Sequence, residues 1–164
     1  MIKYFFLIAL MALSPTFSLA QEVRVLSVID GDTLRVVDSE EQAIKIRLYG
    51  VDCPELGQHS GTRAKEFAKN ILQNKRIMVQ SQGKDRYGRT VAIVILEDGR
   101  SLQERLLRAG LAWHYGQYCR QLRHCSRWKI LEYYARQQKL GLWSEERPVP
   151  PWKWRHNLKG QRGK

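Results

Sequence analysis

The pattern of apolar and polar positions predicts that the first half of the chain is built mainly of β-strands. In residues 44–49 (IKIRLY), aliphatic and polar side chains alternate with the period of an extended chain, so Arg47 points away from the aliphatic face. Runs of β-branched residues occur on either side of this segment, and the triplet DGD at residues 30–32 is a tight-turn signal. The pattern predicts five strands, at residues 23–29, 33–37, 44–49, 76–81 and 90–96.

Three further segments carry apolar residues at the spacing of an α-helix. They are expected to run from Thr62, as N-cap, to Leu72, from a capping box at Ser101 and Glu104 to Gly110, and from Ser126 to Gly141. The order of three strands, a helix, two strands and then helices predicts a small α+β domain built on a β-barrel.

The first twenty residues have the composition of a secretory signal peptide. Lys3 is followed by an apolar run, YFFLIALMAL, then by Pro15 and by small residues that end at Ala20, where we expect cleavage. The run has ten residues, fewer than the roughly 20 that a membrane-spanning helix needs. We therefore expect a periplasmic or secreted protein with no stable membrane association after cleavage.

The rest of the chain divides into a domain and a tail. Residues 21–147 contain all the predicted strands and helices. Residues 148–164 are Pro-rich and then basic, with no acidic residue, and we expect this tail to be partly disordered.

The net positive charge indicates which class of partner the protein binds. The chain has 164 residues, of which 28 are Lys or Arg and 16 are Asp or Glu, giving a formal net charge of +12; 43% are hydrophobic, enough for a globular domain. The positive excess favours an anionic partner, either nucleic acid or a membrane surface. The Gly-rich phosphate loop, G-x-S-x-G and H-E-x-x-H are absent from the sequence, which argues against nucleoside triphosphatases, serine hydrolases and zinc proteases.

The three cysteines are Cys53, Cys119 and Cys125. In an oxidising compartment, the short spacing between Cys119 and Cys125 favours a disulfide between them and leaves Cys53 unpaired. Free thiols, or a zinc site completed by His114 or His124, stay open as alternatives, although the spacer is longer than in common zinc motifs.

Acidic residues are scarce, yet four of them lie close to the ends of predicted strands: Asp30, Asp32, Asp52 and Glu55. Carboxylates grouped in this way can bind a hard cation such as Ca²⁺, which prefers oxygen ligands. Acids that only cap a turn are the simpler explanation of Asp30 and Asp32 taken alone. The second pair strengthens the hypothesis of a cation site.

Two arginines are further candidates. Arg47 lies close to Asp52 in the sequence, and Arg89 lies in a turn that contains a glycine. A guanidinium group can bind two oxygens of a phosphodiester at once, although each arginine alone is explained as a surface residue. A cation, a carboxylate base and two positive groups together suit the hydrolysis of a phosphodiester.

Five motifs, in order and spread over about residues 22–146, give the chain a close resemblance to the staphylococcal nuclease (thermonuclease) family. They are VIDGDT at residues 28–33, IRLYGVDCPE at 46–55, DRYGR at 85–89, AGLA at 109–112 and GLWS at 141–144. The resemblance implies a five-stranded OB-fold β-barrel with three helices. It also implies a Ca²⁺-dependent nuclease that hydrolyses DNA and RNA and leaves 3′-phosphate ends.

The resemblance further implies a set of Ca²⁺ ligands. Asp32 and Asp52 would bind the ion through their carboxylates, and Cys53 would bind it through its backbone carbonyl. The family often has Thr at the position of Cys53. Because the implied ligand is a main-chain oxygen, the exchange should matter little for the metal.

For catalysis, the resemblance implies that Glu55 is the general base or orients the attacking water. It implies that Arg47 and Arg89 bind the scissile phosphate. Arg86 and Tyr87 match motif positions that lie along the nucleotide, so phosphate contact and ring packing are expected there.

Aromatic residues in the second half of the chain have two explanations. Tyr115 and Tyr118 are candidates for stacking on bases. Trp128, Tyr133 and Tyr134 lie at helical spacing, which favours a place in the core or on a helix face over a role as base platforms.

The sequence therefore predicts an exported, monomeric, sugar-nonspecific nuclease that prefers single-stranded DNA or RNA. The alternative from another class is a non-catalytic OB-fold protein that binds nucleic acid or another polyanion. Such a protein would not need the complete set of candidate catalytic and metal-binding residues. A cationic membrane-active protein would need a strongly amphipathic basic helix, and the last predicted helix is only mildly so.

Overall fold

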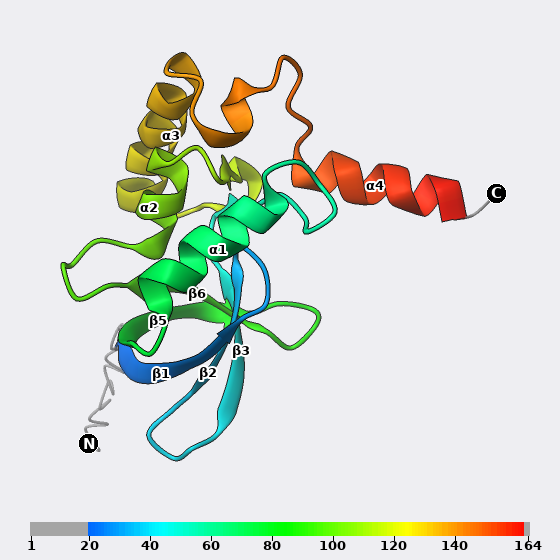
Figure 1. Ribbon diagram of the computed structural model, residues 1–164. Helices are drawn as coiled ribbons and strands as arrows, with labels where there is room; N and C mark the ends of the chain where they lie inside the picture. Colours follow the sequence, from blue (N-terminus) through cyan, green and yellow to red (C-terminus); the bar gives the residue numbers. More distant parts are fainter. Residues whose placement is uncertain (1–19, 163–164) are drawn as a thin grey trace, which may run out of the picture.

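The computed structural model describes residues 20–162, in which five strands close into a β-barrel (Figure 1). The order around the barrel is β1-β2-β3-β6-β5, and neighbours are antiparallel except for the parallel pair β3 and β6. The strands β1, β2, β3, β5 and β6 span Gln21–Val28, Thr33–Val37, Ala43–Leu48, Arg76–Lys84 and Thr90–Ile95. All five predicted strands are present, with ends shifted by a few residues, and the α+β barrel is confirmed.

Four α-helices accompany the barrel among the described residues. They are α1 (Gly61–Leu72), α2 (Leu102–Arg108), α3 (Leu122–Gln137) and α4 (Pro151–Arg162). The other short elements are the two-stranded sheet of β4 (Val51–Asp52) and β7 (Trp113–His114) and the 3-10 turns η1 (Gly116–Tyr118) and η2 (Gly141–Ser144). Between residues 20 and 162, no helix has the length and apolar character that crossing a membrane requires.

The prediction for the start of α1 was wrong by a small shift. The helix begins at Gly61 with Ser60 as N-cap, not after Thr62. A Cβ at Gly61 would lie 1.8 Å from the carbonyl oxygen of Glu55, so the helix begins where a glycine lets the preceding loop pass close by. In α2 the N-cap half of the predicted capping box is confirmed, because the backbone N–H of Glu104 donates to the Ser101 hydroxyl oxygen at 3.2 Å, whereas the Glu104 carboxylate pairs with Arg127 at 2.9 Å.

The predicted start of α3 was also wrong. The helix begins at Leu122 rather than Ser126, and its N-cap residue, Gln121, forms no side-chain capping bond. Cys125 lies in the first turn and is joined by a disulfide to Cys119, just outside the helix. The covalent link therefore holds a helical turn that capping preferences alone did not predict.

The C-terminal tail corrects a third expectation. Its residues up to Arg162 are ordered as α4 rather than partly disordered. Pro151 is the first helical residue, a position where its missing N–H costs no hydrogen bond. The side chain of Trp152 packs edge-on against Trp113, with ring centroids 5.6 Å apart. The predicted signal peptide falls almost entirely outside the described residues.

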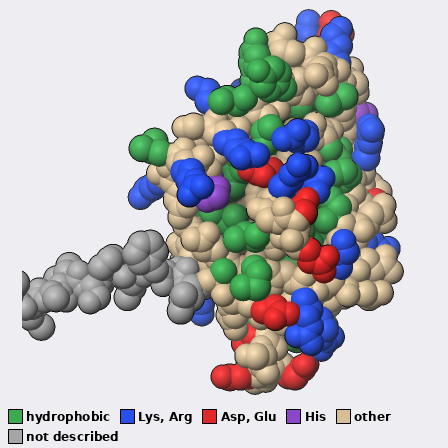
Figure 2. Space-filling model, turned by 90° about the vertical axis from the view of Figure 1, so that its left-hand side faces the viewer, with side chains coloured by type: hydrophobic (Ala, Val, Ile, Leu, Met, Phe, Trp, Pro, Cys, Tyr) green, Lys and Arg blue, Asp and Glu red, His purple; other side chains and the backbone are tan. Residues whose placement is uncertain are grey.

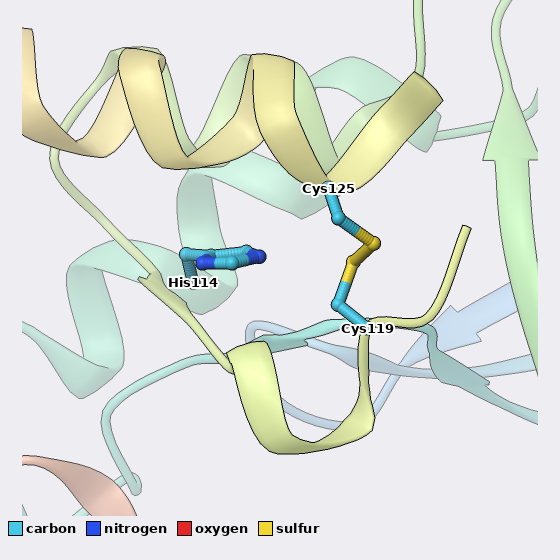
Figure 3. Close-up of side chains that lie close together, drawn as sticks. All are labelled: His114, Cys119 and Cys125. Carbon is cyan, nitrogen blue, oxygen red and sulfur yellow. A yellow bond between two sulfur atoms is a disulfide. The ribbon is translucent and has the colours of Figure 1, made fainter. Parts of the chain in front are cut away.

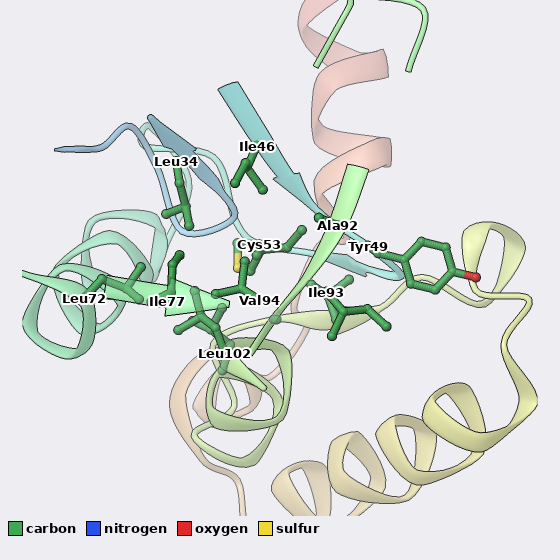
Figure 4. Close-up of a cluster of buried hydrophobic side chains, with 14 of the residues drawn as sticks. Leu34, Ile46, Tyr49, Cys53, Leu72, Ile77, Ala92, Ile93, Val94 and Leu102 are labelled. Atoms are coloured by element: carbon green, nitrogen blue, oxygen red, sulfur yellow. The ribbon is translucent and has the colours of Figure 1, made fainter. Parts of the chain in front are cut away.

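The hydrophobic core fills the barrel and the space beneath α1 and α2 (Figure 4). Leu34 and Ile46 from the strands meet Leu72 of α1 and Leu102 of α2, and all four are almost fully buried. Cys53 points into the same core, as Figure 4 shows. Burial of this apolar surface fixes the end of the barrel where β2 starts and β3 ends, and the charged residues described next lie at that end.

Candidate active site

A buried arginine between two aspartates forms the centre of the site. Arg47, near the end of β3, pairs with Asp32 (Nη1 to Oδ2, 2.9 Å) and with Asp52 (Nη2 to Oδ1, 2.7 Å). The side chains of Asp32 and Asp52 are 8% and 1% exposed, and that of Arg47 is 14% exposed. The structure thus brings together three residues that are separated in the sequence by as many as 20 positions.

Strand pairing explains how Asp32 reaches Arg47. The antiparallel register of β2 and β3 places Thr33 opposite Arg47, and Asp32 directly precedes that pair. The carbonyl oxygen of Asp32 also accepts the N–H of Leu48 at 2.8 Å. The bond from the backbone N–H of Asp32 to the Asp30 carboxylate, 3.1 Å, shows that Asp30 stabilises the turn.

Asp52 is positioned by the turn that follows β3. Gly50 adopts a positive φ of 67°, and a Cβ at this position would lie 2.8 Å from the sulfur of Cys119. The hydroxyl oxygen of Tyr49 accepts the backbone N–H of Arg120 at 2.6 Å, which ties the turn to the same loop. Asp52 then pairs with Trp113 in the small sheet of β4 and β7.

The charges at this centre do not balance. Burial raises the pKa of Asp32 to about 7, and Arg47 opposes that increase. Burial alone would lower the pKa of Arg47, but Asp32 and Asp52 raise it above its ordinary value. Arg47 alone cannot neutralise both carboxylates when Asp32 is ionised, so the centre favours a further positive charge, which Arg155 of α4 supplies at Asp52.

Cys53 supports Asp32 through its backbone. Its N–H donates to Asp32 Oδ2 at 2.6 Å, while its side chain and that of Ala64 both lie close to Gly31. Burial raises the pKa of the Cys53 thiol well above its usual value, and the charge of Asp32 raises it further. The thiol is therefore protonated and belongs to the core rather than to the reacting groups.

Glu55 lies on the loop between β4 and α1 and is more accessible than the aspartates. Its side chain is 37% exposed. Its backbone N–H donates to the side chain of Gln58 at 3.2 Å, and its carbonyl oxygen accepts the N–H of Gln58 at 2.8 Å. Water can therefore reach the Glu55 carboxylate, whereas the carboxylate of Asp52 is closed in.

The sequence analysis missed one residue of this site, Arg155 in α4. Its guanidinium donates to Glu55 (Nη1 to Oε1, 2.6 Å) and to both oxygens of Asp52 (Nη2 to Oδ2, 2.8 Å; Nη1 to Oδ1, 3.2 Å). The Pro-rich, basic composition of residues 148–164 predicted disorder and therefore gave no indication of this contact. Pro151 at a helix start, followed by Trp152 and Arg155 at helical spacing, was the available signal.

Tyr115 and Tyr118 lie beside the acidic centre. The backbone N–H of Tyr115 donates to the carbonyl of Gly50 at 2.9 Å. The ring of Tyr115 contacts that of Tyr118 at a centroid distance of 4.8 Å and stacks on Trp152 at 4.7 Å with an interplanar angle of 3°. Tyr118 is 59% exposed, whereas Trp152 covers one face of Tyr115, so Tyr118 offers the open part of this aromatic surface close to the carboxylates.

The predicted substrate residues of the β5–β6 turn form a separate group. Arg89 Nε pairs with Asp85 Oδ2 at 2.7 Å, and the guanidinium groups of Arg86 and Arg89 lie 5.1 Å and 5.6 Å from the centre of the Tyr87 ring. Slight burial would raise the pKa of Asp85, but the hydrogen bonds from Arg89 lower it. These contacts are formed within the turn, and none of them reaches Asp32, Asp52 or Glu55. The turn leads into β6, whose Thr90 lies beside Ile46 of β3.

A disulfide joins Cys119 and Cys125, the pairing that their spacing favours (Figure 3). The ring of His114 points toward the two sulfurs, and the potential ligand atoms of the three residues lie within 4.8 Å of one another. Because the sulfurs are bonded to each other, they offer no thiolates for the alternative zinc site. The disulfide instead supports the loop that packs on Gly50.

The outer face of α3 carries exposed charged and aromatic side chains. Trp128 is fully buried, in agreement with its predicted place in the core, whereas Tyr133 and Tyr134 are 57% and 58% exposed on the helix face. Figure 2 views the molecule from the side of α2 and α3 and shows Lys and Arg side chains interspersed with apolar ones there. This face is solvated and, on its described contacts, is not part of the acidic centre.

A small closed barrel with carboxylates and an arginine gathered at one end has the framework of a phosphodiester-cleaving OB-fold protein. Comparison with known proteins agrees, since the family described as "Staphylococcal nuclease homologue" matches residues 45–145, more than half of the chain. The chain belongs to the staphylococcal nuclease family. Membership supports a nuclease, a hydrolase whose substrates are nucleic acids.

Individual relatives extend the match over most of the chain. An "uncharacterized endonuclease" of Escherichia coli is 42% identical over 133 residues, covering 81% of this chain and 84% of the relative. The micrococcal nuclease of Shigella flexneri is 33% identical over 145 residues, covering 82% and 80%. A staphylococcal-like nuclease of Arabidopsis thaliana is 37% identical over 116 residues, covering 71% of this chain and 34% of the relative.

Proposed function

We propose that the protein is an exported, Ca²⁺-dependent endonuclease that hydrolyses DNA and RNA and leaves 3′-phosphate ends. The observation that carries this proposal is the convergence of Asp32 and Asp52 on Arg47, with the accessible Glu55 beside them. A protein that only bound nucleic acid would gain little from burying two carboxylates, because they repel phosphate.

The donor set suits a hard divalent cation. The side-chain donors are carboxylate oxygens, and three acids, Asp32, Asp52 and Glu55, share two arginines, Arg47 and Arg155, so a further positive charge is favoured. Asp32 and Asp52, with the backbone carbonyl of Cys53, would hold the ion. When bound, Ca²⁺ supplies a Lewis acid that offsets the negative charge developing on the phosphodiester.

Glu55 is suited to act as a general base. Its carboxylate is exposed enough to meet a water molecule, and it lies next to the charged centre. There it would accept a proton from the attacking water or orient that water, for which one accessible carboxylate oxygen is sufficient.

Arg47 is suited to stabilise the phosphate. Two ion pairs fix its guanidinium before substrate arrives, so little reorganisation is needed when charge develops. Arg89, with Arg86 and Tyr87, would bind the substrate from the β5–β6 turn. That role requires Arg89 to exchange its bond with Asp85 for one with phosphate.

The aromatic pair Tyr115 and Tyr118 supports a preference for single strands. Bases that are free of a duplex can stack on exposed rings, and such stacking does not depend on the sugar. The signal-like N-terminus supports export, and we propose that the mature protein acts as a monomer.

The test is hydrolysis of end-labelled, denatured DNA and of RNA by the purified mature chain. We expect cleavage with Ca²⁺, its loss with a calcium chelator and its return when Ca²⁺ is restored. Products that become substrates for a 3′-phosphatase would establish the 3′-phosphate ends. Tight binding without cleavage in any divalent ion would overturn the proposal in favour of the polyanion-binding alternative.

A further inference from the structure

The helix α4 is held to the body of the protein by two side chains that enter the candidate active site. Arg155 binds Asp52 and Glu55, and Trp152 stacks on Tyr115. Just before the helix, the side chain of Gln58 donates to the carbonyl of Val149. Figure 1 shows the helix starting beside the loop that precedes α1 and extending away from the rest of the molecule.

Arg155 occupies the oxygens that a cation would need. Both carboxylate oxygens of Asp52 accept from its guanidinium, at 2.8 and 3.2 Å, and Glu55 Oε1 accepts at 2.6 Å. A divalent cation on Asp52 would lie within a few ångströms of that guanidinium, and like charges so close together repel strongly in a partly buried site. The two cations therefore exclude one another from Asp52.

The contact is built to be exchangeable. The Arg155 side chain is 41% exposed, although its carboxylate partner Asp52 is 1% exposed. A guanidinium that leaves this position is therefore readily solvated, whereas Asp52 needs another positive charge in its place. Lys153 on the same helix is exposed, so α4 remains cationic after release.

The same helix also covers the aromatic surface. Trp152 is stacked parallel to Tyr115, which is how a nucleic-acid base would stack on that ring. A base that stacks on this face of Tyr115 must displace Trp152. Cation binding at Asp52 and base stacking at Tyr115 thus require release of the same helix.

We propose that α4 is an intramolecular ligand of the active site, whose Arg155 a divalent cation must displace from Asp52 and Glu55. The helix thereby lowers the cation affinity of the free protein. This inference rests on the proposed function, because it requires that Asp52 be a cation ligand. By linkage, nucleic acid that displaces Trp152 also raises cation affinity, so the two ligands favour each other's binding.

The test compares Ca²⁺ binding to the mature protein and its variants by isothermal titration calorimetry without nucleic acid. Arg155→Gln removes the guanidinium, and Lys153→Gln removes the same charge from an exposed position on the same helix. We expect the dissociation constant for Ca²⁺ to fall at least about tenfold in Arg155→Gln, equivalent to about 1.4 kcal/mol. In Lys153→Gln it should change less than about twofold, because that charge is solvated.

Arg155→Lys is a second variant that retains the charge but loses the fork with which Arg155 bridges two acids. It should bind Ca²⁺ with an affinity between those of the wild type and Arg155→Gln. Thermal unfolding of each variant in chelator checks that the fold is retained. We expect it to be retained, because the Arg155 side chain is 41% exposed.

The outcomes separate this inference from the proposed function. Equal Ca²⁺ affinity of the wild type and Arg155→Gln, or an equal gain in Lys153→Gln, would overturn the role of α4 and leave Ca²⁺ binding intact. Absence of Ca²⁺ binding in every variant at millimolar concentration would overturn this inference together with the calcium dependence of the proposed nuclease. A nuclease assay in chelator would then show whether hydrolysis itself survives.

Discussion

Replacement of Arg47 by methionine tests whether the buried centre depends on a single cation. Methionine replaces the aliphatic stem of arginine but ends short of the guanidinium, so the charge and both ion pairs are lost. Arg47 pairs with Asp32 and Asp52, whose side chains are 8% and 1% exposed. Removing one partner of such a buried network typically destabilises a protein by about 3–5 kcal/mol, because a buried charge is left uncompensated.

Two features of the site place the expected loss near the lower end of that range. The pKa of Asp32 is already raised to about 7, so in the variant this carboxyl can take up a proton at neutral pH instead of remaining charged. Arg155 also still binds Asp52. We therefore expect Arg47→Met to lower the free energy of unfolding by about 3 kcal/mol.

The assay is urea unfolding followed by tryptophan fluorescence, in chelator and at neutral pH. Arg89→Met is the matched control, because Arg89 pairs with Asp85 in a half-exposed turn and should cost only about 0–1 kcal/mol. The difference between the variants should shrink at acid pH, where protonated carboxylates no longer need a counter-charge. If Arg47→Met were no less stable than Arg89→Met, with unchanged dependence on urea concentration, the ion-pair network would not hold the site together.

Three other variants test separate parts of the structure. Glu55→Gln should lower kcat by about 10²–10⁴ with little change in nucleic-acid affinity; unchanged turnover in single-turnover kinetics would remove Glu55 from catalysis. Gly31→Ala should destabilise by about 1–3 kcal/mol, because its methyl group would lie 2.7 Å from a neighbouring Cβ, whereas Gly57→Ala meets nothing within 4 Å; equal melting temperatures would contradict the packing. Burial lowers the pKa of His114 and of His124 from 6.5, so the unfolded state binds protons more readily at these residues, and they lower stability as pH drops below about 6.5. Asp32 acts in the opposite direction over this range, because its raised pKa favours the folded state as pH falls. Replacing both histidines by Gln should therefore make the variant more stable relative to the wild type as pH drops, and a difference that does not change with pH would exclude this role of the histidines.

The barrel was predictable from the sequence because each strand carries its own signal. The alternation in residues 44–49 correctly indicated that Arg47 lies opposite the aliphatic side of β3. Strand pairing was not predictable in the same way, since the contact between Asp32 and Arg47 depends on the register in which β2 and β3 pair. The resemblance to a family, rather than any spacing, identified these residues as members of one site.

The missed part of the site illustrates the limit of composition as a guide. Proline and basic residues after position 147 suggested disorder, because such a segment can bury little apolar surface. The helix is stabilised by two sets of contacts. Trp152 packs against Tyr115 and Trp113, and Arg155 binds the carboxylates of Asp52 and Glu55. Those partners lie more than 30 residues away in the sequence, so no local pattern reports them.

The charged groups that converge on Asp52 differ in how firmly the fold holds them. Asp52 itself is fixed by β4 and by the turn at Gly50 that packs on the disulfide loop. Arg47 belongs to a barrel strand and is 14% exposed, so it cannot leave without disturbing β3. Arg155 is 41% exposed and comes from a helix whose inward contacts are few. Because both arginines share one buried carboxylate, the proposed cation would meet least resistance from Arg155, and the order of anchoring would determine which positive charge is exchanged and which remains to meet the phosphate.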